Sequence, residues 1–205
     1  MTRRKNKSAD RLAALTHMSL QQIENDDWGD PDPDDTGLVK RCMWLRRKPL
    51  DEFDDADLYD LIMQRISWPI LVPMALSRLA VDPWLDCDVV TAVLLRTVAR
   101  VKDEYWQANP DQTAELEGIV ERVIGLLEDD PGYMPAGQPH EWPSEWFPGD
   151  TVDGAMGIPE CYWQAHPGQF ARMCDVVARA SEAGLLDGTS RALRALYLQA
   201  AKLND

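Results

Sequence analysis

The sequence predicts an all-α protein, and three observations support this class. Between residues 36 and 127, apolar residues recur at intervals of three and four, which is the periodicity of amphipathic helices. Residues suited to helix N-caps, or prolines suited to a first helical turn, precede most of these segments. No segment has the alternation typical of a β-strand. We therefore expect a bundle of about six to eight helices, a long Pro/Gly-rich loop over 131–159 and two C-terminal helices.

The first helices are predicted by their boundary residues. One helix is expected somewhere within 10–25, where leucines and an isoleucine provide an apolar face. A second is capped by Thr36 and stopped by Pro49, because proline cannot continue a helix. A third begins at Asp54, which has capping-box spacing to the acid Asp57.

Three further helices are expected before residue 131. Each has an apolar face at helical spacing and a residue able to begin the helix. The candidate first residues or caps are, in chain order, Pro69 or Pro73, Asp86 or Asp88, and Asn109-Pro110.

The composition changes after residue 130. Residues 131–159 contain six prolines and five glycines, with Trp142, Trp146 and Phe147 between them. This indicates a long irregular segment whose aromatic side chains pack on the protein or bind a partner. Helices are expected again around 167–184 and 189–203. We accordingly predict three regions, which are a basic tail with a short helix (1–18), a helical core (19–130), and a loop plus helical extension packed on the core (131–205).

One eight-residue pattern occurs twice. Tyr105-Trp-Gln-Ala-Asn-Pro-Asp-Gln112 returns 57 residues later as Tyr162-Trp-Gln-Ala-His-Pro-Gly-Gln169, with six identities. In both copies the proline is placed for the first turn of a following helix. The pattern indicates a duplicated aromatic turn with its helix. Packing explains such a unit more readily than catalysis, and a repeated binding surface is the alternative.

The charge is large and unevenly distributed. The chain has 21 basic and 35 acidic residues, giving a net charge of −14, although residues 1–11 carry a positive excess. An acidic surface repels nucleic acid and anionic membrane, and it attracts basic partners. A solubilising role for the charge is the simpler alternative. We expect a protein partner, with no nucleic acid and no membrane.

The sequence gives no indication of catalysis. The three histidines lack metal-ligand spacing, and phosphate-binding glycine loops and nucleophile motifs are missing. The alternating acids Asp30, Asp32 and Asp34 resemble part of a calcium loop, but prolines replace its glycine turn and no glutamate closes it. We therefore predict that the protein is not an enzyme, with no catalytic residue, no cofactor and no metal site.

Two acidic clusters are the main candidates for a binding surface. One lies within 24–35 and the other within 51–60, and a basic block of Lys40, Arg41, Arg46, Arg47 and Lys48 separates them. The clusters either pair with this block or form a docking face for a basic protein, and the sequence leaves both open. The predicted partner-binding residues are Asp26, Asp27, Asp30, Asp32 and Asp34 first, and Asp54, Asp55 and Asp57 second.

Several short motifs in order resemble the immunity proteins of contact-dependent growth inhibition (CDI) systems. They are Asp27-Trp-Gly-Asp-Pro31, Leu45-Arg-Arg-Lys-Pro-Leu50, Asp57-Leu-x-x-Leu-Ile-x-Gln64, Leu71-Val-Pro-x-Ala-Leu76 and Asp82-Pro83, followed by Tyr105-Trp106. The resemblance covers about 19–128, and departs from the family at Met63 and Cys87, where glycines are common. Its signature residues, which we expect to be structural, are Trp28, Gly29, Pro31, Leu45, Arg46, Pro49, Leu50, Gln64, Pro73, Tyr105 and Trp106.

The resemblance implies a specific function. Such immunity proteins lie in the cytoplasm and neutralise a cognate toxin domain, often a nuclease, that neighbouring cells deliver. A basic nuclease would suit an acidic partner. The lack of an apolar segment after the basic N-terminus also agrees with a cytoplasmic location. An acidic helical adaptor that binds a peptide or helix, without any toxin, remains the alternative.

Overall fold

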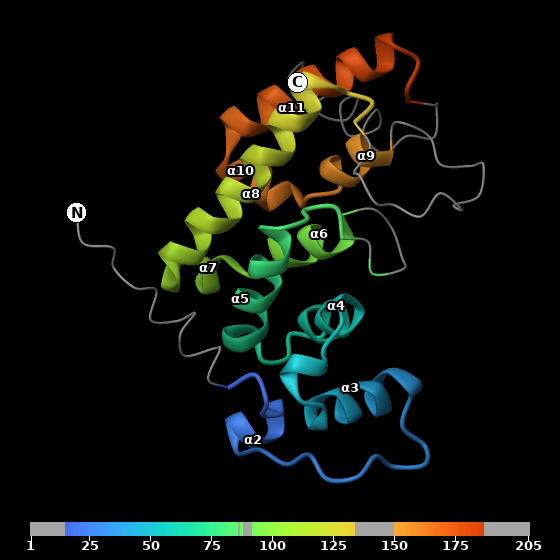
Figure 1. The fold of residues 1–205 in the computed structure, drawn as a ribbon, viewed down its shortest axis with the longest axis vertical. Coiled ribbons are helices and arrows are strands. Elements are labelled where there is room, and N and C mark those ends of the chain that lie inside the picture. The colour runs from blue at the N-terminus through green and yellow to red at the C-terminus, as the bar shows by residue number, and fades with distance from the viewer. Residues whose placement is uncertain (1–14, 86, 88–91, 134–149, 187–205) are drawn as a thin grey trace, which may run out of the picture. The chain divides into compact units, whose positions relative to one another are not determined.

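The protein is seen here as a computed structural model, which describes residues 15–85, 87, 92–133 and 150–186 (Figure 1). The described residues form ten α-helices and one 3-10 helix, with no strand beyond an isolated bridge between Ser19 and Pro49. The all-α class is therefore confirmed. The chain divides into two compact units, residues 1–75 and 76–205.

The first unit is built around a helix that packs on neighbours from both sides. Its elements are α2 (Leu20–Glu24), α3 (Gly37–Arg47), η1 (Leu50–Glu52), α4 (Asp55–Met63) and most of α5 (Trp68–Leu79). Helix α3 contacts both α2 and α4. Leu20, Leu45, Leu58 and Leu61 are completely buried and form part of the interior. Leu38 and Val39, which the helical spacing also placed on the apolar face of α3, are exposed.

The boundaries of these helices follow the predicted signals. Thr36 caps α3, accepting a hydrogen bond from the Val39 amide, and α3 ends just before Pro49. Asp54 and Asp57 form the expected capping box at the start of α4. In α5, Pro69 lies in the first turn and Pro73 lies inside the helix.

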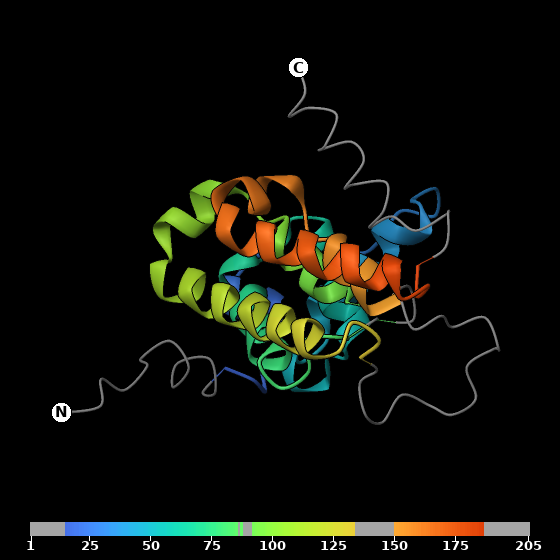
Figure 2. The same ribbon diagram turned by 90° about the horizontal axis from the view of Figure 1, so that it is seen from above.

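The second unit contains two long helices that lie side by side (Figure 2). Its further elements are α6 (Val93–Ala99), α7 (Asp103–Ala108), α8 (Pro110–Asp129), α9 (Asp150–Met156), α10 (Glu160–Ala165) and α11 (Pro167–Glu182). Helices α8 and α11 run in the same direction, because Glu117 near the start of α8 meets His166, and Glu128 near its end meets Arg172.

The duplicated pattern has the same local structure in both copies. Tyr105 donates a hydrogen bond to Gln112 at 2.6 Å, and Tyr162 donates one to Gln169 at 2.8 Å. Each tyrosine ring meets the following tryptophan edge-to-face at 5.4 Å. Burial raises the pKa of Tyr105 to about 12. Both copies thus share one local structure, in which a short aromatic helix precedes a long helix.

Some predictions differ from the structure or lie outside its described part. Helix α6 begins at Val93 and has Ala92 at its N-cap, whereas Asp86 and Asp88 were expected to cap it and lie outside the described residues. Helix α9 falls inside the segment predicted to be irregular. Residues 1–14, the aromatic residues between 142 and 147, and the helix expected at 189–203 lie outside the described part. The predicted division into three regions remains a prediction.

Candidate protein-binding site

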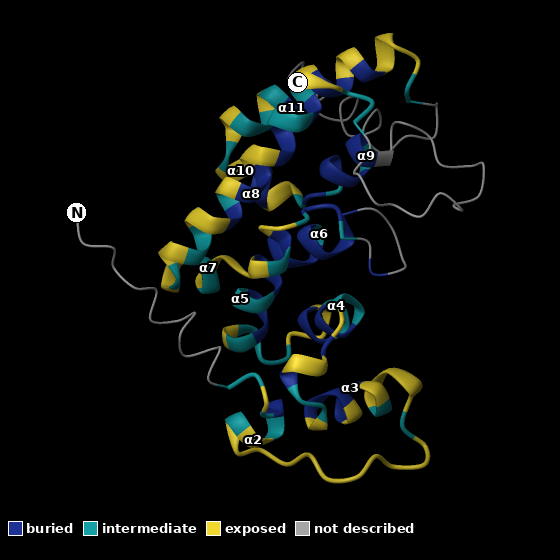
Figure 3. Cartoon of the chain, viewed as in Figure 1, coloured by how far each residue is buried: buried dark blue, intermediate teal, exposed yellow. Residues whose placement is uncertain are grey.

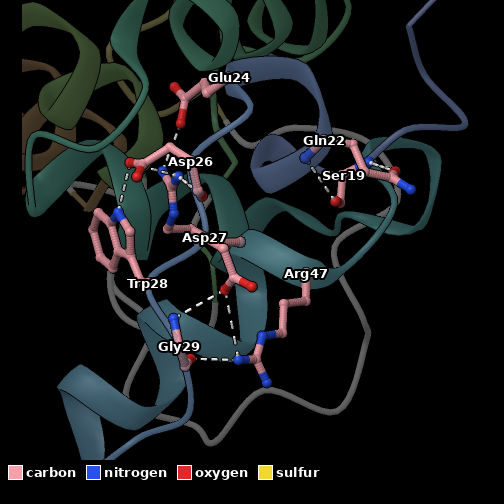
Figure 4. A network of polar contacts seen from close by, with 9 residues as sticks. Ser19, Gln22, Glu24, Asp26, Asp27, Trp28, Gly29 and Arg47 are labelled. Carbon is pink, nitrogen blue, oxygen red and sulfur yellow. Dashed lines mark hydrogen bonds and ion pairs between the residues drawn. The ribbon is translucent and has the colours of Figure 1, made fainter.

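The acidic segment, residues 24–35, runs along the first unit between α2 and α3, and most of it is exposed (Figure 3). Left-handed backbone at Asn25, with φ of 50°, ends α2 and redirects the chain. Gly29, with φ of 72°, makes a second turn that an L side chain would strain. The Asp27 carboxylate accepts a hydrogen bond from the Gly29 amide at 2.9 Å (Figure 4). The segment therefore has a defined, turn-rich path.

Arg46 anchors the beginning of this segment and is only 3% exposed. Its guanidinium donates to the Glu24 carboxylate at 2.6 Å and to the Asp26 carboxylate at 3.2 Å. It also donates to the Asp26 backbone carbonyl at 3.0 Å. The centre of the Trp28 ring lies 4.2 Å from the guanidinium carbon. The Trp28 indole N–H donates to the Asp26 carboxylate (Figure 4). A buried charge is thus paired and stacked by the acidic segment.

Arg47 and Lys40 hold the middle of the segment from the exposed side of α3. Arg47 donates to the Asp30 carboxylate at 2.9 Å. It also donates to the Gly29 carbonyl (Figure 4). Lys40 donates to the Pro33 carbonyl at 2.6 Å. Some hydrogen bonds from these two basic side chains go to backbone carbonyls and not to carboxylates. The negative charge of the segment is therefore only partly neutralised.

The second acidic cluster pairs with the other side of α3. Asp57 is 2% exposed and accepts hydrogen bonds from Lys48 at 2.6 Å and from Arg41 at 3.1 Å. Arg41 also donates to Asp60, and this hydrogen bond raises the pKa of the Arg41 guanidinium. The basic block therefore divides its contacts between the two acidic clusters.

The predicted binding residues thus lie in two kinds of environment. Asp57 is buried in an ion-pair network, and Asp54 caps α4. Asp26 is tied to Arg46 and Trp28. Asp27 and Asp30 lie 4.0 Å and 2.9 Å from the Arg47 guanidinium, and their side chains are 64% and 90% exposed. Asp32 and Asp34 are also exposed, and the Asp32 carboxylate accepts a hydrogen bond from the Asp34 amide.

Most signature residues have clear structural positions. Leu45 and Leu50 are buried, and Pro49 forms the bridge with Ser19. Arg46 and Trp28 fix the acidic segment. The helical periodicity could have predicted the burial of Arg46, because Arg46 lies on the inward-facing side of α3 together with Cys42 and Leu45.

Residues 22–116 match the family model described as CDI immunity proteins. Over this segment, which is slightly less than half of the chain, the sequence is similar to the CDI immunity proteins. The match includes the acidic segment, the basic block and the first copy of the Tyr-Trp unit. No curated protein and no solved structure matches the chain.

The CDI immunity match ends within α8, so the second Tyr-Trp unit lies beyond it. Helices α10 and α11 repeat the arrangement of α7 and α8 that precedes them. A structural unit that begins inside the family segment is thus present again in the extension.

The described residues include neither a membrane-spanning helix nor a metal-binding group. They contain no helix that combines the length and apolar character needed to cross a membrane. They also contain no group of three or more His, Cys, Asp or Glu side chains arranged to hold a metal ion.

Proposed function

We propose that this protein neutralises a cognate CDI toxin domain by binding it stoichiometrically in the cytoplasm, without a catalytic step of its own. The observation that carries the proposal is the match of residues 22–116 to the CDI immunity proteins. The acidic helical adaptor remains the second hypothesis, and the match favours immunity over it.

We also propose that the toxin domain is basic, as a nuclease domain would be, and that it docks on the acidic segment. Between Glu24 and Asp60 the sequence has 13 acidic and five basic residues. After internal pairing, the exposed carboxylates still leave a negative surface. Such a surface favours and orients association with a basic protein.

The anchoring of the acidic segment supports this role. Arg46, Arg47 and Lys40 hold the segment on α3 from three points along its length. A segment already fixed in place loses less conformational entropy on binding than a flexible one. The basic block thus presents the remaining acids in a defined arrangement.

The exposed acids of the segment are the first candidates for direct toxin contacts, namely Asp27, Asp30, Asp32 and Asp34. Asp26 and Asp57 come next, because each is bonded to a mostly buried basic side chain, Arg46 or Lys48, whereas the Arg47 partner of Asp30 is 41% exposed. Asp54 and Asp55 have a weaker claim, since both lie at the start of α4, where carboxylates favour the helix dipole.

The test is a binding titration against the toxin domain of the CDI protein encoded beside this chain. We expect a 1:1 complex, and we expect co-expression to protect cells from the toxin. Combined Asp30→Asn, Asp32→Asn and Asp34→Asn substitutions should weaken binding by about tenfold or more, chiefly through slower association. Asparagine keeps the side-chain oxygens that form the local turns.

The matched control makes the same change in charge within the second unit, at the exposed acids Asp103→Asn, Glu104→Gln and Asp111→Asn. We expect this control to bind nearly as tightly as the parent. A parent protein that neither binds nor protects would rule out the immunity function and favour the adaptor. If both variants bind as tightly as the parent, docking on the acidic segment is ruled out and the immunity function still stands.

A further inference from the structure

Helix α3 carries an exposed tryptophan that the interior of the protein does not use. Trp44 is 56% exposed, the largest exposed fraction among the exposed aromatic side chains of the described residues. The buried face of α3 consists of Cys42, Met43, Leu45 and Arg46. By helical periodicity Trp44 lies on the opposite face of α3. Packing of the helix against the interior therefore does not explain a tryptophan at this position.

Four basic residues surround Trp44 at the spacings of three and four that make helix neighbours, and each already has an acceptor. Lys40 and Arg47 hold the acidic segment on one side. Arg41 and Lys48 pair with Asp57 on the other side. The Lys48 ammonium also lies 5.4 Å from the Trp44 ring. Trp44 is thus an apolar centre between two ion-pair networks.

We infer that Trp44 is a central contact of the toxin-binding face, an inference that rests on the proposed function. Protein interfaces concentrate their binding energy in a few tryptophan, tyrosine and arginine side chains, and polar residues around them exclude water. Trp44 and the surrounding ion pairs have this arrangement.

The occupant is a basic protein domain with an apolar depression that accepts the indole ring. Its basic character follows from the charge around the ring, because three of the four bases near Trp44 pair with carboxylates and the acidic segment adds a net negative surface. The exposed acids of the acidic segment speed association with a basic partner, whereas the buried contact of the Trp44 ring slows dissociation. The two groups of residues therefore have separable kinetic effects.

The experiment measures association and dissociation of the full chain with the toxin domain of the neighbouring CDI protein. Trp44→Ala should weaken binding by about 30-fold, mainly through faster dissociation. Its melting temperature should stay close to that of the parent, because the ring is mostly exposed. Val81→Ala, at an apolar side chain that is 84% exposed in the second unit, is the control and should bind like the parent.

A second measurement uses the unmutated protein. Hydroxyl-radical footprinting should show that Trp44 is oxidised in the free protein and protected in the complex. Parent-like binding by Trp44→Ala, or a Trp44 that stays reactive in the complex, would overturn the inference while the immunity function stands. Absence of binding by the parent itself would overturn both. If Trp44→Ala lowers the melting temperature, the footprint decides between a structural and a binding role.

Discussion

Arg46 and Arg47 are adjacent in the sequence, but their side chains lie in different environments. Arg46 is 3% exposed, whereas the Arg47 side chain is 41% exposed. Removing one partner from a buried ion pair is strongly destabilising, while an exposed pair contributes little. The acidic segment should therefore depend on Arg46 for its stability and on Arg47 mainly for its local path.

This contrast gives a prediction for single substitutions. Arg46→Ala should lower the free energy of unfolding by about 2–4 kcal/mol, because it removes charged hydrogen bonds to Glu24 and Asp26 and the stacking on Trp28. Arg47→Ala is the matched control and should cost less than about 1 kcal/mol. Denaturant unfolding of both variants measures the difference. Equal losses would show that Arg46 does not anchor the segment.

At the level of single residues, the sequence predicted the composition of the candidate site better than its contacts. Both acidic clusters and the basic block were evident, and so was the possibility that they pair. The burial of Asp57 was not evident, because a helix-capping acid is normally exposed. In the structure both Lys48 and Arg41 donate hydrogen bonds to its carboxylate. Trp44 was missed because its exposure depends on which face of α3 packs inward.

Among the helices, predictions succeeded where caps and apolar periodicity agreed. Helices α3, α4, α8 and α11 begin at or next to the expected residues. Helices α7, α9 and α10 have six or seven residues, which is too short for periodicity to identify them. Tertiary packing stabilises such short helices, and sequence patterns do not report it directly.

An arginine lies between two glutamates where α8 contacts α11. Arg172 donates to Glu128 at 2.7 Å and also to Glu121. Its hydrogen bonds lower the pKa of both carboxyl groups from their ordinary value of 4.5. A carboxyl group with a lowered pKa stabilises the fold above pH 4.5, and this stabilisation is lost as the pH falls through the lowered pKa.

Arg172→Met should therefore lower the melting temperature at pH 7 by about 1–4 °C, since the glutamates are partly exposed and each pair contributes modestly. The difference from the parent should shrink below about pH 4, as the carboxyl groups of the folded parent become protonated. Thermal unfolding over a pH series measures it. Arg100→Met, at an exposed arginine of the same unit, should show no such convergence. A difference that persists unchanged at low pH would mean that Arg172 acts through packing.

Over the whole molecule, the net charge of −14 provides a long-range field that single contacts do not. Such a field raises the association rate with a basic partner, and salt screens it over about 8 Å at physiological ionic strength. Dissociation depends on contacts already formed and is less sensitive to salt. The proposed toxin interaction should therefore respond to salt mainly through its association rate.

We predict that raising the salt concentration from about 10 mM to about 150 mM will slow association with the toxin domain by roughly tenfold or more, and will change dissociation little. The Asp30/Asp32/Asp34 triple variant should show a weaker salt dependence than the parent. The equally charged Asp103/Glu104/Asp111 variant should retain most of it, because its changes lie outside the acidic segment. Rapid-mixing kinetics at several salt concentrations measures all three proteins. If both triple variants lose the salt dependence equally, total charge steers the toxin and the acidic segment has no special part. If the parent itself associates at a rate independent of salt, the partner is not basic, and both docking on the acidic segment and the basic occupant inferred for Trp44 are wrong.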